Sequence, residues 1–108
     1  MKQEKDLCGY VYIDGDAQDY FALRVSSDNM INVGIVPGAL LIVHKQSFAF
    51  DGDIVVVSVD GESKVLRYKK NDGVTFLMPE NSARSPILIT EKTDFHIFGK
   101  VIEYRLKI

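Results

Sequence analysis

The fold is decided by residues 53–70, which read DIVVVSVDGESKVLRYKK. Residues 53–60 form a valine-rich run, and residues 63–70 supply a second run of matching length. β-Branched residues favour extended strands, and Asp60-Gly61 favours a tight turn because glycine tolerates a positive φ angle. The stretch therefore predicts a β-hairpin.

The same short β pattern extends outward from this hairpin in both directions. Residues 27–33 lack strand character and are expected to hold a helical turn before Gly34. The chain is thus predicted to be mainly β, a compact domain of curved antiparallel sheets over residues 20–108, preceded by an arm at residues 1–19. Further strands are predicted at residues 20–26, 39–44, 74–78, 86–90 and 95–106.

Composition excludes several classes of protein. The 108 residues carry 13 basic and 15 acidic side chains, for a formal net charge of −2. Direct nucleic-acid binding is not expected, because phosphate contacts need clustered Lys and Arg. No apolar run reaches the roughly 18 residues of a membrane span, and residues 1–6 are too charged to begin a secretory signal.

The reactive side chains are few. Cys8 is the one cysteine, which rules out an internal disulfide framework and fits a reducing cytoplasm. His44 and His96 lie far apart in the sequence, so no metal-ligand cluster can be written. No metal or cofactor is expected.

Five stretches occur in a fixed order: YFALRVSSDNMIN (20–32), GIVPGALLIV (34–43), DGDIVV with DGE (51–56 and 60–62), LMPEN (77–81) and FGKVI (98–102). Together they resemble the C-terminal domain of LexA, UmuD and related phage repressors. The resemblance covers residues 20–105 and implies the LexA/signal-peptidase-like fold. Members of this family cut themselves with a serine–lysine dyad, in which a neutral, desolvated lysine activates the serine hydroxyl.

The resemblance places different residues at both dyad positions. Residues 26–30 align with the family's Ser-Gly-Asp-Ser-Met, so Asn29 takes the place of the nucleophile. Residues 60–67 align with Asp-Gly-Glu-x-x-Val-Lys-Arg, so Leu66 takes the place of the lysine. The amide of Asn29 cannot replace a serine hydroxyl as the nucleophile, and the side chain of Leu66 cannot accept a proton. The resemblance therefore implies a degenerate peptidase. Its former active-site neighbourhood comprises Ser26, Ser27, Asp28, Met30 and Lys64.

Two further features of the site are open to more than one interpretation. Ser26 or Ser27 with Lys64 could form a relocated dyad, but Lys64 lies two residues from position 66, about 6.5 to 7 Å along a strand. Catalytic geometry tolerates shifts of about 0.5 Å, so solvated turn and strand residues are favoured. Cys8-Gly9 resembles the bond that the family cleaves; alternatively, residues 8–13 form an edge strand.

The resemblance therefore predicts a non-catalytic, cytoplasmic UmuD/LexA-like accessory or regulatory protein of the DNA-damage (SOS) response. A homodimer is expected through residues 95–108, with Ile97, Val101 and Leu106 either in the interface or against the chain's own core. Expected partners are an error-prone DNA polymerase subunit or a recombinase filament, and peptide capture in the old groove is a further role. The alternatives are an active peptidase with a relocated dyad and the remnant of a phage or mobile-element repressor, since no helix-turn-helix reader precedes residue 20.

Overall fold

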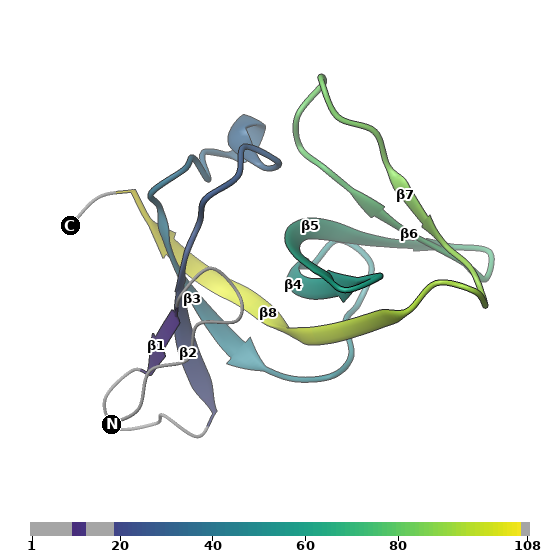
Figure 1. Cartoon of the computed structure of the whole chain (residues 1–108), viewed down its shortest axis with the longest axis horizontal. Helices are drawn as coiled ribbons and strands as arrows, with labels where there is room; N and C mark the ends of the chain where they lie inside the picture. Colours follow the sequence, from purple (N-terminus) through teal and green to yellow (C-terminus); the bar gives the residue numbers. More distant parts are fainter. Residues whose placement is uncertain (1–9, 13–18, 107–108) are drawn as a thin grey trace.

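The predicted hairpin is present as β4 (Ile54–Val59) and β5 (Glu62–Asn71). A computed structural model describes residues 10–12 and 19–106, and its strands form one antiparallel sheet in the order β1-β2-β3-β8-β4-β5-β6-β7 (Figure 1). A short 3₁₀ turn, η1, spans Ile31–Val33 within the segment expected to hold a helical turn. The mainly β prediction is confirmed. The other strands are β1 (Tyr10–Tyr12), β2 (Tyr20–Arg24), β3 (Leu40–Lys45), β6 (Val74–Met78), β7 (Ile87–Ile89) and β8 (Phe95–Arg105).

The last strand, β8, lies in the middle of the sheet. Its C-terminal half pairs with β3 and its N-terminal half pairs with β4. In Figure 1 it runs along the molecule and joins β1–β3 to β4–β7. The pairing register shifts once against each neighbour, and such bulges bend a strand and increase its twist. These two irregularities bend β8 where it passes from β4 to β3.

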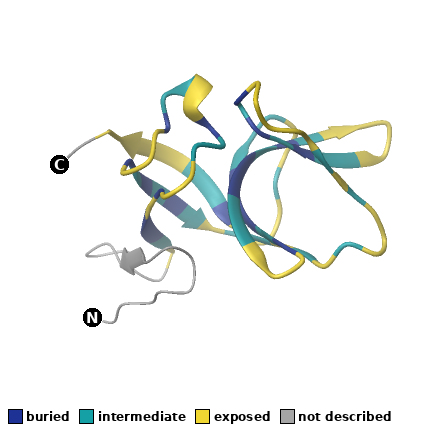
Figure 2. Ribbon diagram, turned by 45° about the horizontal axis from the view of Figure 1, so that its top comes forward, coloured by how far each residue is buried: buried dark blue, intermediate teal, exposed yellow. Residues whose placement is uncertain are grey.

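Two hydrophobic clusters fill the two sides of the β4–β5 hairpin. Val56 and Val65 face each other across the hairpin and pack with residues of β2 and β3. Their neighbours Val55 and Leu66 point to the opposite side. This explains why residues 54–57 are apolar without alternation. Figure 2 shows the buried residues along the inner parts of the ribbon. The first cluster is Phe21, Leu23, Val25, Met30, Ile35, Ala39, Leu41, Val43, Val56 and Val65; the second is Val55, Val57, Val59, Leu66, Tyr68 and Leu77.

The N-terminal segment extends the sheet at one edge. β1 pairs with β2 in a register that sets Tyr10 opposite Leu23. This agrees with an edge strand for part of residues 8–13. Cys8 and Gly9 lie outside the described residues. Within the described ranges, no helix is long and apolar enough to cross a membrane.

Candidate functional site

The loop between β2 and β3 carries Asn29 and is anchored in the first cluster. Met30 and Ile35 are buried, with 1% and 0% of their surface exposed, and they form an isolated β-bridge. Gly34 closes the turn between them with a φ of +90° and donates its amide to the Ile31 carbonyl oxygen at 3.0 Å. A residue with a side chain rarely adopts that φ. The loop therefore holds Asn29 half-buried at a fixed place.

A second segment braces this loop from the side of β6. Asn81 is the buried polar side chain of the described residues, at 6% exposure. Its Nδ2 donates to the Asp28 carbonyl oxygen at 2.8 Å, and its Oδ1 accepts from the Ala83 amide at 2.9 Å. Arg84 Nη2 lies 2.6 Å from Asp28 Oδ1. In the sequence, Asn81 was noted only as part of the LMPEN stretch that carries the family resemblance. No local pattern around Asn81 predicted its contact with Asp28.

Leu66, at the position aligned with the family's lysine, is a core residue. It is 2% exposed, lies opposite Val55 on β4 and packs in the second cluster with Leu77. Burial of a leucine of this kind contributes about 1.5 to 3 kcal/mol. Position 66 therefore stabilises the fold through packing in the second cluster.

A small hollow lies between the end of β2 and the β4–β5 hairpin. The structure thus brings Ser26 and Ser27 to the same hollow as Lys64, whereas Asn29 and Leu66 do not line it. Lys64 Nζ is 3.3 Å from Glu62 Oε1, so its ammonium is engaged with a carboxylate. The lining residues are Leu23, Val25, Ser26, Ser27, Val56, Ser63, Lys64 and Val65.

A wider hollow lies beside the brace formed by Asn81 and Arg84. Arg67 Nε donates to Glu80 Oε2 at 2.7 Å and its Nη1 donates to the Gly52 carbonyl oxygen at 2.6 Å. Lys69 Nζ is 3.8 Å from Asp51. Each of the three cations that line this hollow has a carboxylate within 3.8 Å, which offsets part of its charge. The lining residues are Asn32, Arg67, Lys69, Met78, Pro79, Glu80, Asn81, Ser82 and Arg84.

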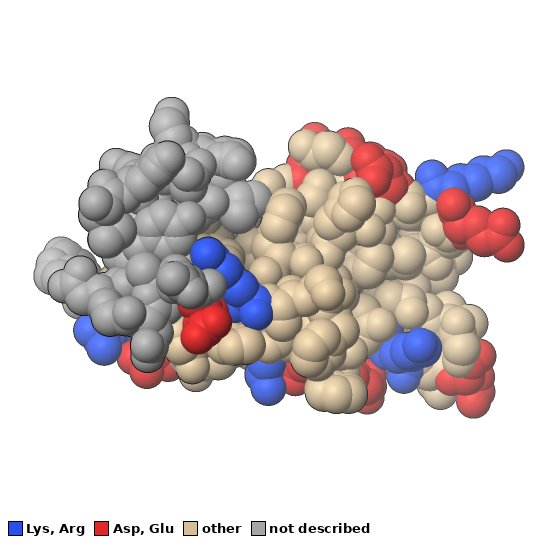
Figure 3. Space-filling model, turned by 90° about the horizontal axis from the view of Figure 1, so that it is seen from below, with Lys and Arg blue, Asp and Glu red and all other residues tan. Residues whose placement is uncertain are grey.

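Acidic and basic side chains of the described residues are mixed on one face of the molecule. On the face seen in Figure 3, Lys and Arg are interspersed with Asp and Glu around a broad uncharged centre. The structure also shows no group of three or more His, Cys, Asp or Glu side chains placed to hold a metal ion among the described residues.

The apolar residues expected in a dimer interface do not share one environment. Ile97 packs against the second cluster and Val101 against the first, so both serve the chain's own core. Leu106 is 56% exposed. Ile102 and Tyr104, which were not among the predicted contacts, are exposed at 48% and 39%. The exposed apolar residues at and just after the C-terminal end of β8 are therefore Ile102, Tyr104 and Leu106, and the interface through Ile97, Val101 and Leu106 stays a prediction.

Comparison with known proteins supports the family resemblance found in the sequence. Residues 3–102 match the family model described as Peptidase S24-like. The LexA repressor of Carboxydothermus hydrogenoformans is 46% identical over 87 residues, covering 79% of this chain and 42% of the relative. The LexA repressor of Lactobacillus johnsonii is 43% identical over 91 residues, covering 83% and 42%.

A longer match covers most of the chain. The LexA repressor of Geotalea uraniireducens is 39% identical over 101 residues, covering 90% of this chain and 50% of the relative. The chain thus spans at most about half the length of these relatives. The chain belongs to the Peptidase S24-like family, the family of these LexA repressors.

Proposed function

We propose that this chain is a non-catalytic member of its family, a UmuD/LexA-like accessory or regulatory protein of the DNA-damage response. It acts through self-association and protein partners, of which a polymerase subunit and a recombinase filament are the candidates. The observation that carries the proposal is Leu66, which fills the core at the position where the alignment expects a lysine base. Asn29, at the aligned nucleophile position, supplies an amide in place of a hydroxyl.

Self-processing of the purified chain tests the proposal directly. The chain is incubated with activated recombinase filaments, and separately at alkaline pH, and its intact mass is followed by mass spectrometry. We expect the mass to stay unchanged, because neither aligned position offers the chemistry that hydrolysis needs. A fragment beginning at Gly9 under either condition would contradict the proposal.

A pair of double variants separates lost chemistry from a lost groove. Asn29→Ser with Leu66→Lys restores a nucleophile and a base, and burial among apolar side chains lowers the pKa of a lysine towards the neutral form. Asn29→Ser with Leu66→Met fills similar space with no base. Cleavage by the first variant alone would show that the groove survives. Unfolding curves of both variants establish that each is folded.

A second candidate, a relocated dyad, is favoured by one observation. Ser26, Ser27 and Ser63 line the same hollow as Lys64. The contact between Lys64 and Glu62 weighs against it, since the ammonium is occupied. If the parent chain does cleave itself, Lys64→Met should abolish cleavage and Lys92→Met, on an exposed turn, should not.

A further inference from the structure

The turn at residues 31–34 is held on opposite sides by two distant parts of the chain. The Tyr104 hydroxyl, on β8, donates to the Val33 carbonyl oxygen at 2.6 Å. The backbone amide of Asn32 donates to the Glu80 carbonyl oxygen at 2.8 Å. Adjacent residues of one turn thus connect the end of β8 to the segment that follows β6.

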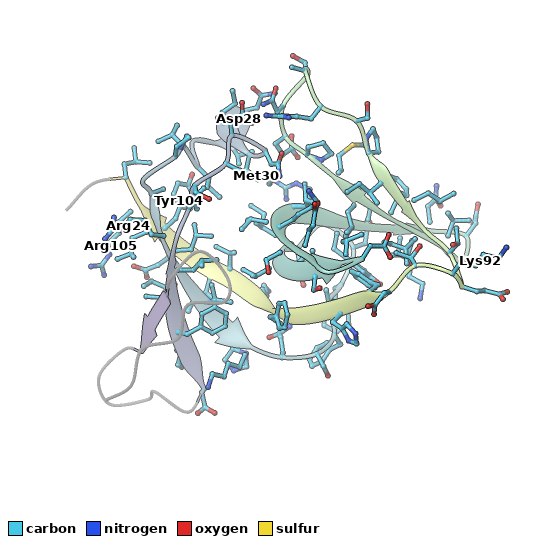
Figure 4. All side chains as sticks on the ribbon, in the orientation of Figure 1. Arg24, Asp28, Met30, Lys92, Tyr104 and Arg105 are labelled. Atoms are coloured by element: carbon cyan, nitrogen blue, oxygen red, sulfur yellow. The ribbon has the colours of Figure 1, made fainter. Side chains whose placement is uncertain are left out.

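The attachment to β8 is accessible to solvent. Tyr104 is 39% exposed and lies opposite Leu41 of β3, near the C-terminal end of β8. Its ring lies over Gly34, where an added Cβ would be 3.3 Å from the tyrosine Oη. Figure 4 shows Tyr104 on the same side of the molecule as Asp28 and Met30 of the loop. A neutral hydrogen bond that is accessible to solvent contributes only modestly to stability. Small structural changes around Tyr104 therefore suffice to break its bond to Val33.

The opposite attachment belongs to the wider hollow. Asn32 lines that hollow, and the carboxylate of Glu80 accepts from Arg67 Nε at 2.7 Å. Arg67 in turn donates to the Gly52 carbonyl oxygen. A group that moved Arg67 or Glu80 would therefore move the carbonyl that holds Asn32.

We propose that residues 31–34 form a coupling turn between the exposed end of β8 and the wider hollow. Breaking the Tyr104 attachment weakens the Asn32 attachment, and breaking the Asn32 attachment weakens the Tyr104 attachment, with the same coupling free energy in both directions because linkage is reciprocal. The coupling rests on the two hydrogen bonds and does not depend on the lost peptidase chemistry or on dimerisation.

Amide hydrogen exchange of the full chain, followed by NMR, tests the coupling. Tyr104→Phe removes one hydroxyl. We expect the Val33 and Gly34 amides to exchange about 5- to 10-fold faster, as the loss of one modest hydrogen bond implies. The Asn32 amide should exchange about threefold faster, although its acceptor is Glu80 rather than Tyr104. Tyr20→Phe, on β2 beside His44, is the matched control and should leave these rates unchanged.

The reverse experiment starts at the hollow. Arg67→Met releases the Glu80 carboxylate and should speed exchange at Gly34 several-fold, with Tyr104 intact. Rates are normalised to Val56 and Val57 in β4, so that a general loss of stability cancels. If Tyr104→Phe leaves Asn32 unchanged and Arg67→Met leaves Gly34 unchanged, the two attachments are independent and the proposal is wrong.

Discussion

At the scale of single residues, the two aligned dyad positions now have different environments. Asn29 is half-buried in a braced loop, whereas Leu66 is enclosed by the second cluster. The family resemblance alone predicts both substitutions. The resemblance could not reveal that the loop carrying Asn29 is anchored in the first cluster, whereas Leu66 packs in the second. That difference depends on the three-dimensional position of each cluster on the two sides of β5.

Leu66→Ala should lower the free energy of unfolding by about 2 to 5 kcal/mol, because it leaves a cavity in a closed cluster. Leu66→Met, which keeps the volume, should cost less than about 1.5 kcal/mol. Urea unfolding followed by circular dichroism measures both. Equal, small losses for the two variants would show that position 66 is not a packing position.

Asn81 is a residue whose role the sequence could not give, because it acts on Asp28, 53 positions away. Asn81→Asp keeps an acceptor for the Ala83 amide but replaces the donor to the Asp28 carbonyl with an oxygen. We expect a loss of about 1 to 3 kcal/mol, the cost of an unsatisfied buried group. The exposed Asn71→Asp should change stability by less than about 0.5 kcal/mol. A thermal unfolding series compares the two, and equal effects would refute a bracing role.

At the scale of elements, the sequence predicted most strands within a few residues, because each is a short β-branched run between turn residues. It did not predict the position of β8 between β3 and β4. That position depends on contacts between segments some 50 residues apart, which no local pattern records. At Gly99, β8 lies so close to β3 that an added Cβ would collide with the His44 carbonyl oxygen and with Val43.

Gly99→Ala should therefore be among the most damaging small substitutions, with a loss above about 3 kcal/mol, because backbone must shift to relieve the collision. Gly38→Ala is the matched control. Gly38 has a φ of +96° but open space around it, so the substitution should cost only the conformational strain of about 1 to 2 kcal/mol. Denaturant midpoints of the two variants should differ clearly. A Gly99→Ala protein as stable as Gly38→Ala would contradict the close approach.

At the scale of the whole molecule, self-association should depend on the C-terminal end of β8. Leu106 and Leu88 are exposed to nearly the same extent, 56% and 58%, but Leu106 follows β8 while Leu88 lies on the edge strand β7. Sedimentation velocity should show a dimer for the parent and for Leu88→Glu, and a shift of at least tenfold towards monomer for Leu106→Glu. A charge placed in an apolar interface has that effect. Equal responses of the two variants would place the interface elsewhere.

The central position of β8 also has a consequence for the order of synthesis. A ribosome makes β3 and β4 well before β8, so both strands leave the exit tunnel with one edge unpaired. Unpaired edges are templates for association with other chains. The sheet closes only after residue 105 has emerged, and until then the nascent chain depends on rapid completion or on chaperones to keep those edges apart.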